Sequence, residues 1–456
     1  MPWSLIIASA LGAPAPHLVL VSLDTTRADA LSCYGAQPRP AQGAAQTTPV
    51  LDALAADGLR LERFYANAPS TLSSHATMLT GLDPHGHSVV RNGYPLGPPP
   101  TLAERLQGEG YDTIAVVGAA ALESAMGLDR GFRIYDDEVL SLRGLMYQDT
   151  ADGVVRRALT AVDARRPDAP LFLLVHFYDP HTPYVPPEPY VRAVTDPGYR
   201  GGVTGDGPRF KRLAQAVRSG GARREDVQHV DELYLAEVAF VDAQIGLLLD
   251  GLRRRGLLEH SLVVVVADHG ETLGDDPIYA WSHGSNVAHE VMWVPLIMRG
   301  YGMPLARHAV VQRQASMDGL APTLEIALGL QPTLGTGLPF YDLLRAGPAL
   351  DRDGWPDRPT LPVRVEATRP RRAEVAEGWN NLALYRGIWA GGWGAFAAPF
   401  IDRPLTFYDQ GAPPDPGILG ELGLMLEAWD AAAPPHVEAQ MAPATRRALE
   451  ALGYLE

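Results

Sequence analysis

The sequence predicts an α/β protein with a large mixed, mainly parallel sheet sandwiched by helices and a smaller C-terminal α+β subdomain. Over residues 17–300, short apolar runs typical of buried parallel strands alternate with segments of helical spacing. Several of these runs end abruptly at an aspartate or a histidine, which is typical of strands whose carboxyl ends carry a functional site.

The predicted strands are runs rich in leucine and β-branched residues. The first, residues 17–23 (HLVLVSL), is followed directly by Asp24, and the most strand-like, residues 261–267 (SLVVVVA), directly precedes Asp268 and His269. The other predicted strands are 111–118, 171–176 and 294–298. Continuous apolar runs of this length indicate strands that are covered on both faces.

Helices are predicted where proline and glycine bracket a periodic pattern. Residues 49–58 carry a proline near the start and a glycine at the end, and residues 231–255 place apolar side chains at helical spacing before Gly256. Residues 194–224 are rich in glycine and arginine without periodicity, and they predict a long surface loop.

Three regions are predicted along the chain. Residues 17–340 form the larger domain, and residues 341–456 form the smaller subdomain of short strands, closed by a helix over 443–452. Residues 1–16 are apolar and then rich in alanine and proline, as in a secretory signal, but they lack a positive leading segment. Export and a cytoplasmic location therefore both stay open.

Composition excludes several classes of protein. A formal charge of −15 argues against a sequence-independent nucleic-acid binder. The one cysteine, Cys33, excludes an internal disulfide and a multi-cysteine metal cluster, and no apolar run reaches the ~18 residues of a membrane span. The only lysine, Lys211, lies in the predicted loop, so an active-site lysine is excluded as well. Nothing in the sequence indicates the oligomeric state.

Acidic residues and histidines gather after three predicted strands: Asp24, then Asp179 with His181, then Asp268 with His269. Such clustering at one sheet edge predicts a metal-assisted site, although an aspartate after a single strand is more often a helix cap. A hydroxyl-rich segment, residues 68–81 (APSTLSSHATMLTG), turns helical and offers a nucleophile near a helix N-terminus. Simple helix capping by Ser70 or Thr71 is the structural alternative.

Five motifs in order carry a family resemblance. They are VSLDTTRADALSCYG, TLSSHATMLTG with PHGHSVVRNG, VHFYDPHTPY, LVVVVADHGETLGD and SHGSNVAHEVMWVPL. With these motifs the chain resembles the sulfatase-like branch of the alkaline phosphatase superfamily from about residue 17 to 300. The resemblance implies that family's fold and a hydrolase or transferase of ester bonds.

The chain departs from true sulfatases at the nucleophile. Sulfatases carry a Cys or Ser in a C/S-x-P/A-x-R motif that is converted to formylglycine, and the aligned residues here are Thr71 and His75. No formylglycine is therefore expected, and the lysines that sulfatases use around the sulfate are absent. The pattern instead resembles threonine-nucleophile relatives, namely phosphodiesterases and phosphoethanolamine transferases.

The resemblance implies one divalent metal, held by Asp24, Thr71, Asp268 and His269. Two carboxylates, an imidazole and an alkoxide suit zinc or manganese better than calcium. Asp179 with His181 or His283 is an open alternative for a second metal, and Thr25 stands where many sulfatases have a further acidic ligand.

The remaining site residues follow from the same resemblance. Thr71 is the expected nucleophile, with His181 and His283 as proton donors or electrostatic stabilisers beside the leaving group. Asn92 is expected to bind a non-bridging oxygen, and His75 to support the nucleophile in place of the sulfatase arginine.

The leading hypothesis is a metal-dependent hydrolase of small anionic phosphate esters, mainly diesters. The alternatives are a sulfate ester hydrolase, a phosphoethanolamine-type transferase and a non-catalytic relative that binds an anion. The substrate itself is not predicted by any motif.

Overall fold

The computed structural model describes residues 14–35, 47–138, 141–143, 146–277, 279–346, 363–367, 385–390, 393–397, 406–409 and 416–432. Its centre is an eight-stranded mixed sheet. In spatial order the strands are β11 (Ala309–Val311), β2 (Leu59–Leu61), β10 (Leu296–Tyr301), β9 (Ser261–Ala267), β1 (His17–Leu23), β8 (Leu171–Phe177), β4 (Asp112–Val117) and β5 (Ile134–Asp136).

The central strands β9, β1, β8, β4 and β5 are parallel, whereas β10 runs antiparallel to both β9 and β2. Every residue of β4, β8 and β9 is buried, as expected for strands covered on both faces. All five predicted runs form strands of this sheet, and the predicted mixed, mainly parallel α/β fold is confirmed.

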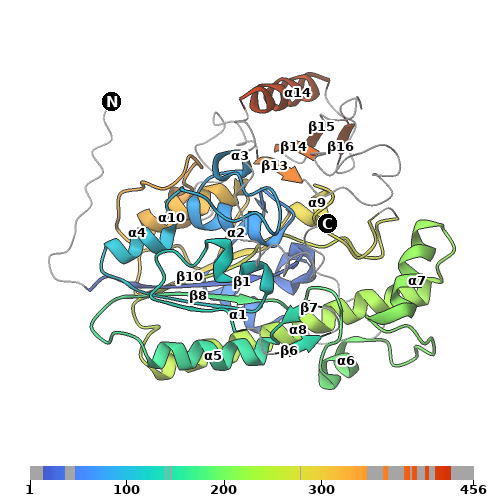
Figure 1. Ribbon diagram of the computed structural model, residues 1–456, viewed down its shortest axis with the longest axis horizontal. Coiled ribbons are helices and arrows are strands. Elements are labelled where there is room, and N and C mark those ends of the chain that lie inside the picture. Colours follow the sequence, from blue (N-terminus) through green and yellow to red (C-terminus); the bar gives the residue numbers. More distant parts are fainter. Residues whose placement is uncertain are drawn as a thin grey trace.

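Helices cover both faces of the sheet (Figure 1). One layer contains α1 (Pro49–Asp57), α5 (Ala151–Asp163) and α8 (Arg224–Arg254), and the other contains α2 (Thr71–Thr80), α4 (Leu102–Gly108) and α10 (Leu320–Ala327). The shorter elements are β3 (Phe64–Tyr65), β6 (Ser141–Arg143), β7 (Met146–Gln148), β12 (Ala315–Ser316), α3 (Pro84–His87), α6 (Glu188–Val194), α7 (Gly207–Arg218), α9 (His289–Met292) and α11 (Tyr341–Ala346). Within these described ranges no helix is long and apolar enough to cross a membrane.

The long helix α8 anchors loops through buried carboxylates. Glu237 accepts the Val185 N–H at 2.7 Å, and Asp242 accepts the N–H groups of Val50 and Leu51 at 3.0 and 2.8 Å, at the start of α1. Both carboxylates are thus paired with backbone N–H groups inside the fold. These contacts explain why so apolar a helix retains acidic residues on its buried face.

The segment 194–224 differs from the predicted long loop, because α7 lies within it and α8 already begins at its last residue, Arg224. Pro208 lies in the first turn of α7, where the N–H groups have no partner within the helix, so its missing N–H removes no helical hydrogen bond. Apolar residues at positions 210, 213, 214 and 217 then form a helical stripe, which the surrounding arginines and glycines obscure in the sequence.

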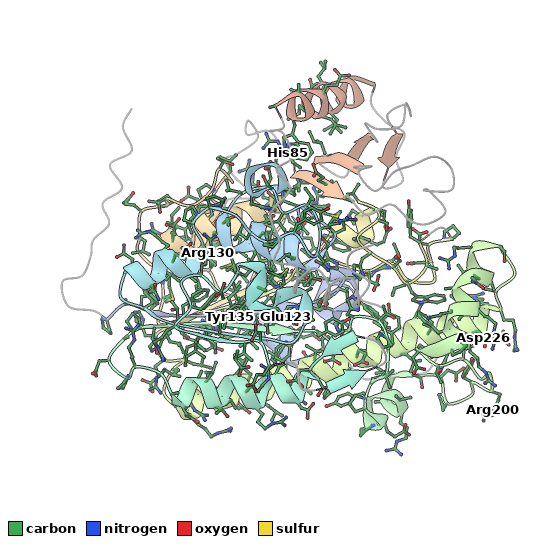
Figure 2. All side chains as sticks on the ribbon, in the orientation of Figure 1. His85, Glu123, Arg130, Tyr135, Arg200 and Asp226 are labelled. Carbon is green, nitrogen blue, oxygen red and sulfur yellow. The ribbon has the colours of Figure 1, made fainter. Side chains whose placement is uncertain are left out.

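The described C-terminal residues form an antiparallel sheet of β13 (Val363–Ala367), β14 (Tyr385–Ala390), β15 (Trp393–Ala397) and β16 (Thr406–Asp409), with helix α14 (Pro416–Ala431). They contact the main domain at α3, through His85 (labelled in Figure 2). His85 Nε2 lies 2.7 Å from Glu366 Oε2, and its ring stacks on that of Trp429 with the ring centroids 3.9 Å apart. The predicted helix over 443–452 and residues 1–13 lie outside the described residues.

Candidate metal centre and active site

Two aspartates follow adjacent central strands at the same edge of the sheet. Asp24 comes directly after β1 and donates its N–H to the Phe177 carbonyl oxygen at 3.0 Å, while Asp268 follows β9 and donates to the Leu23 carbonyl oxygen at 3.1 Å. The sheet ladder thus continues one residue beyond each strand. Both carboxylates are therefore brought into the same fully buried space.

His269 completes a cluster with these two carboxylates. One side-chain atom from each of Asp24, Asp268 and His269 lies within 4.8 Å of the others. His269 Nε2 is 3.7 Å from Asp24 Oδ1 and 3.6 Å from Asp268 Oδ2. Ligand atoms about 2.1 Å from a shared cation are separated by roughly 3.4 Å in a tetrahedral shell, so these distances suit common ligands of one ion.

The ligand atoms of this cluster lack hydrogen-bond partners within the described residues. They are both oxygens of Asp24, Oδ2 of Asp268 and Nε2 of His269. Buried polar atoms are rarely left without partners, because the desolvation cost is high. The residues therefore fit a divalent cation, which would satisfy these atoms together.

The tautomer of His269 also suits a metal ligand. Its Nδ1 lies 2.9 Å from the Gly270 carbonyl oxygen, so Nδ1 carries the proton and Nε2 keeps its lone pair for the cluster. Gly270 is required here, because a Cβ atom would lie 2.1 Å from the Glu290 carbonyl oxygen. The Asp-His-Gly sequence thus sets both the imidazole and its orientation.

The two aspartates have opposite pKa shifts. Burial disfavours the charged form of Asp24, but the His176, His181 and His269 imidazoles outweigh burial and hold its pKa below the usual range. Burial and the charge of Asp24 raise the pKa of Asp268. Burial lowers the pKa of His269 to about 3, so this imidazole is neutral, as a metal ligand must be.

Thr71 is the first residue of α2 and is buried beside this edge. One turn later, Ser74 Oγ donates to the Asp268 carbonyl oxygen at 2.5 Å, and His75 Nε2 lies 2.9 Å from Ser22 Oγ. These contacts hold the first turn of α2 against the ends of β1 and β9. The helix turn that carries Thr71 is therefore held at the edge of the sheet where Asp24 and Asp268 lie.

Asn92 contacts the same helix start. Its Oδ1 accepts the Leu72 N–H at 2.8 Å, which satisfies one of the unpaired N–H groups at the N-terminus of α2. This contact fixes the side-chain amide and leaves Nδ2 as the group that can donate to a substrate. The predicted role of Asn92 in binding a non-bridging oxygen thus remains a prediction, compatible with this geometry.

His75 lies behind the nucleophile and is fully buried. Its Nδ1 donates to the Thr71 carbonyl oxygen at 2.7 Å, while its Nε2 accepts from Ser22 Oγ. Both ring nitrogens are thus engaged within the protein, which suits support of the turn that carries Thr71. His75, His176 and Asp268 also approach one another closely, but the protonated Nδ1 of His75 faces Asp268 and cannot ligate a metal.

His181 and His283 lie side by side next to the cluster. The ring centroid of His283 is 4.8 Å from that of His181 and 4.7 Å from that of His269. His181 Nδ1 contacts the Thr182 carbonyl oxygen at 2.6 Å, and His283 Nδ1 contacts Glu271 Oε1 at 3.1 Å. Each imidazole is therefore held in place through its Nδ1.

Sequence reasoning missed two buried residues of this site. Glu271 orients His283, and its position directly after Asp-His-Gly was the available signal. His176 lies inside β8 opposite Ser22, with Nε2 3.5 Å from Asp24 Oδ2. A histidine within an otherwise apolar strand was the signal in that case.

Asp179, considered for a second metal, has a different contact. Its Oδ2 accepts the Ala151 N–H at 2.9 Å, at the first residue of α5. A carboxylate at a helix N-terminus is a common stabilising arrangement. The geometry therefore favours helix capping for Asp179 rather than a second metal shared with His181.

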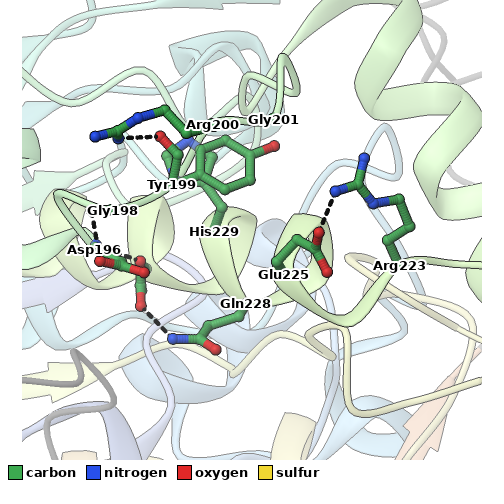
Figure 3. A pocket seen from close by; sticks show the side chains of 10 residues that line it. Asp196, Gly198, Tyr199, Arg200, Gly201, Arg223, Glu225, Gln228 and His229 are labelled. Carbon is green, nitrogen blue, oxygen red and sulfur yellow. Dashed lines mark hydrogen bonds and ion pairs between the residues drawn. The ribbon is translucent and has the colours of Figure 1, made fainter.

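A separate polar cavity of about 240 Å³ lies between the segment 196–201 and the first turns of α8 (Figure 3). Its walls are largely occupied by mutual contacts, such as the Arg223–Glu225 ion pair and Tyr199 stacked on His229 at 3.9 Å. None of the cluster residues lines it. This cavity is therefore separate from the cluster at the sheet edge.

The fold and this cluster define an α/β protein with a buried carboxylate–imidazole centre at the carboxyl edge of its parallel strands. The chain belongs to the sulfatase family, because the family model named Sulfatase matches residues 16–330. The resemblance to the sulfatase-like branch of the alkaline phosphatase superfamily is thereby confirmed.

Two curated relatives carry sulfatase names. An arylsulfatase of Clostridium perfringens is 22% identical over 314 residues, which cover 57% of this chain and 64% of the relative. The uncharacterized sulfatase YidJ of Escherichia coli is 24% identical over 347 residues, covering 68% of this chain and 67% of the relative. The chain thus spans about two thirds of the length of these relatives.

A solved structure of a protein that is not named a sulfatase has the same fold as this chain. The phosphonate monoester hydrolase of Silicibacter pomeroyi has a TM-score of 0.67 and 20% sequence identity, with 93% of this chain and 96% of that chain covered. At this identity the likeness establishes the fold alone.

Proposed function

We propose that this sulfatase-family protein is a metal-dependent hydrolase of phosphate diesters that uses Thr71 as its nucleophile. The observation that carries the proposal is the place of Thr71 at the first residue of α2, in a turn that Ser74 and His75 tie to the strand ends beside Asp268. The residue aligned with the formylglycine precursor of sulfatases is thus a threonine, which offers an alkoxide instead of an aldehyde hydrate.

The proposed metal ligands are Asp24, Asp268, His269 and Thr71. The donor set of two carboxylates, one imidazole and one hydroxyl favours zinc or manganese over calcium, which prefers shells made only of oxygen. When bound, such a cation lowers the pKa of a ligated hydroxyl and polarises a phosphoryl oxygen.

The chain's own residues account for the bond changes. Thr71 Oγ1 forms a bond to phosphorus while the bond to the leaving alcohol breaks, which gives a phosphothreonine that still carries the second ester group. Water then forms a bond to phosphorus while the bond between phosphorus and Thr71 Oγ1 breaks, and one proton of the water returns to Oγ1. The proton lost by the Thr71 hydroxyl is gained by the departing alcohol, and His181 and His283 are the imidazoles placed to carry it.

The charge of the site favours a monoanionic substrate. The only lysine, Lys211, lies on α7, and a divalent cation with the carboxylates of Asp24 and Asp268 and the alkoxide of Thr71 would carry one net negative charge. A phosphate diester carries one negative charge, which this site accommodates more easily than the dianion of a monoester. The similar structure named phosphonate monoester hydrolase supports the same preference, because a phosphonate monoester, like a phosphate diester, carries a single negative charge.

A sulfate ester is the second candidate substrate. It is favoured by the family match and by the arylsulfatase name of the Clostridium perfringens relative. A sulfate monoester is also a monoanion, so charge alone does not separate it from a phosphate diester.

The substrate class is tested by assaying aryl phosphate diester, aryl phosphate monoester and aryl sulfate in parallel, with zinc or manganese. Thr71→Ala is compared with wild type, and Thr80→Ala serves as a matched control, because Thr80 is buried at the other end of the same helix. We expect metal-dependent diester turnover that Thr71→Ala abolishes and Thr80→Ala retains. Faster turnover of sulfate than of diester, or turnover that survives Thr71→Ala, would overturn the proposal.

A further inference from the structure

His176 is a fully buried histidine that the proposed reaction does not use. It lies in β8, between the apolar Val175 and Phe177, and its register partner across the sheet is Ser22 of β1. Ser22 is two residues before Asp24. The side chain of His176 therefore lies next to the proposed metal ligand Asp24.

Neither ring nitrogen of His176 has a hydrogen-bond partner within the described part of the chain. Leaving two polar atoms of one buried side chain unpaired is costly, and such cases in native proteins usually mark a missing partner. Asp24 Oδ2 is likewise unpaired, and it lies 3.5 Å from His176 Nε2. Each of these two atoms is placed to satisfy the other after a shift of a few tenths of an ångström.

The two oxygens of Asp24 point to different neighbours. Oδ1 is the oxygen 3.7 Å from His269 Nε2, on the side of the proposed metal, whereas Oδ2 is the oxygen next to His176. A carboxylate that ligates a metal through one oxygen is commonly held by a hydrogen bond to the other, and loss of that bond weakens metal binding.

We propose that His176 is a positioning residue for the metal centre, in which its Nε2–H donates to Asp24 Oδ2 and so directs Oδ1 to the cation. This inference rests on the proposed metal centre and extends it. His176 is held by its own environment, because its ring packs edge to face on His75, with centroids 5.0 Å apart. His75 is in turn fixed through Ser22 and the Thr71 carbonyl oxygen. The same buried network therefore orients both a metal ligand and the turn of the nucleophile.

The test is equilibrium metal affinity, measured by competition with a chromophoric chelator for Zn²⁺ or Mn²⁺. The variants are His176→Leu, which removes the donor, and His176→Gln, which retains an amide N–H. His87→Gln is the matched control, because His87 is also a buried histidine but contacts Thr77 Oγ1 and the Val89 N–H instead of the cluster. The thermal midpoint of each metal-free variant reports whether it is folded.

We expect His176→Leu to weaken metal binding about 10- to 100-fold, with partial rescue by His176→Gln and wild-type affinity in the control. The absorption spectrum of the Co²⁺-loaded protein should keep its band positions in His176→Gln, because the number and type of ligands do not change. Should His176→Leu fail to fold, the affinity and spectrum of His176→Gln decide the question.

Three outcomes would overturn the inference or its premise. Wild-type affinity in both His176 variants would leave His176 without a positioning role. A Co²⁺ spectrum in His176→Gln that shows loss of a nitrogen ligand would make His176 a direct ligand instead. Absence of metal binding by the wild-type protein would refute the proposed metal centre itself, which is a different result from either of these.

Discussion

Replacing Asp268 by asparagine should stabilise the metal-free protein while it removes the stabilisation that metal provides. Asp24 and Asp268 are both fully buried, and their ligand atoms lie within 4.8 Å of each other. At that separation, two unit charges repel by about 3.5 kcal/mol for an effective dielectric constant of 20. Because the pKa of Asp268 is raised, partial protonation already relieves part of this repulsion, so we expect a gain of about 1–3 kcal/mol.

The substitution preserves the local hydrogen bonds. Asp268 Oδ1 accepts the N–H groups of Thr25 and His269 at 3.2 and 2.7 Å, and the asparagine carbonyl oxygen can accept both. The amide nitrogen would then occupy the place of Oδ2, the atom without a partner. A change in stability therefore reports the removed charge rather than lost contacts.

The assay is urea unfolding with and without zinc or manganese. At a free metal concentration about a hundredfold above Kd, wild type should gain about 2.7 kcal/mol, and Asp268→Asn should gain far less. Asp179→Asn is the control that should keep the metal-dependent gain, since Asp179 contacts the start of α5. A metal-free Asp268→Asn protein that is less stable than wild type, or that gains fully from metal, would refute the electrostatic reasoning.

Three further substitutions test other parts of the account. Burial raises the pKa of Asp242 to about 7, so the stability that its protonated carboxyl contributes is present below pH ~3.8 and is lost as the pH rises through about 7. Asp242→Asn should therefore reduce the fall in the free energy of unfolding over this pH range, measured by urea unfolding. An unchanged dependence on pH would contradict this prediction. Gly270→Ala should cost about 1–3 kcal/mol in the same assay, because its Cβ would meet the Glu290 carbonyl oxygen at 2.1 Å; wild-type stability would argue against this packing. Glu271→Gln should slow turnover of esters with alkyl leaving groups more than of aryl esters, because Glu271 holds His283, and equal losses for both would remove His283 from proton transfer.

The main sheet was predictable because its strands are local patterns. Continuous apolar runs such as 261–267 can only be buried, and the polar residue that ends each run marks the edge where parallel strands meet. Asp24, Asp268 and His269 were predicted as neighbours on that ground. The register of β1 with β9 indeed brings them together.

The contacts of the site that lie deeper were not predictable. His176 pairs with Asp24 on another strand, and Glu271 pairs with His283 on another loop, and the sequence around each residue does not specify its partner. Helix α7 was missed because its apolar stripe is interrupted by arginines and preceded by glycines, which dominate local propensity. Tertiary packing against α8, rather than intrinsic helix propensity, accounts for the helical structure of α7.

The central claim is that Thr71 attacks phosphorus and carries the substrate during turnover. The most direct measurement is peptide mass spectrometry after rapid acid quenching of the metal-loaded enzyme in turnover with an aryl alkyl phosphate diester. We predict a phosphothreonine at Thr71 that retains the alkyl ester, absent in Thr71→Ala and without metal. An unmodified Thr71 under conditions where product forms in a burst, or an adduct on Ser73 or Ser74, would contradict the account.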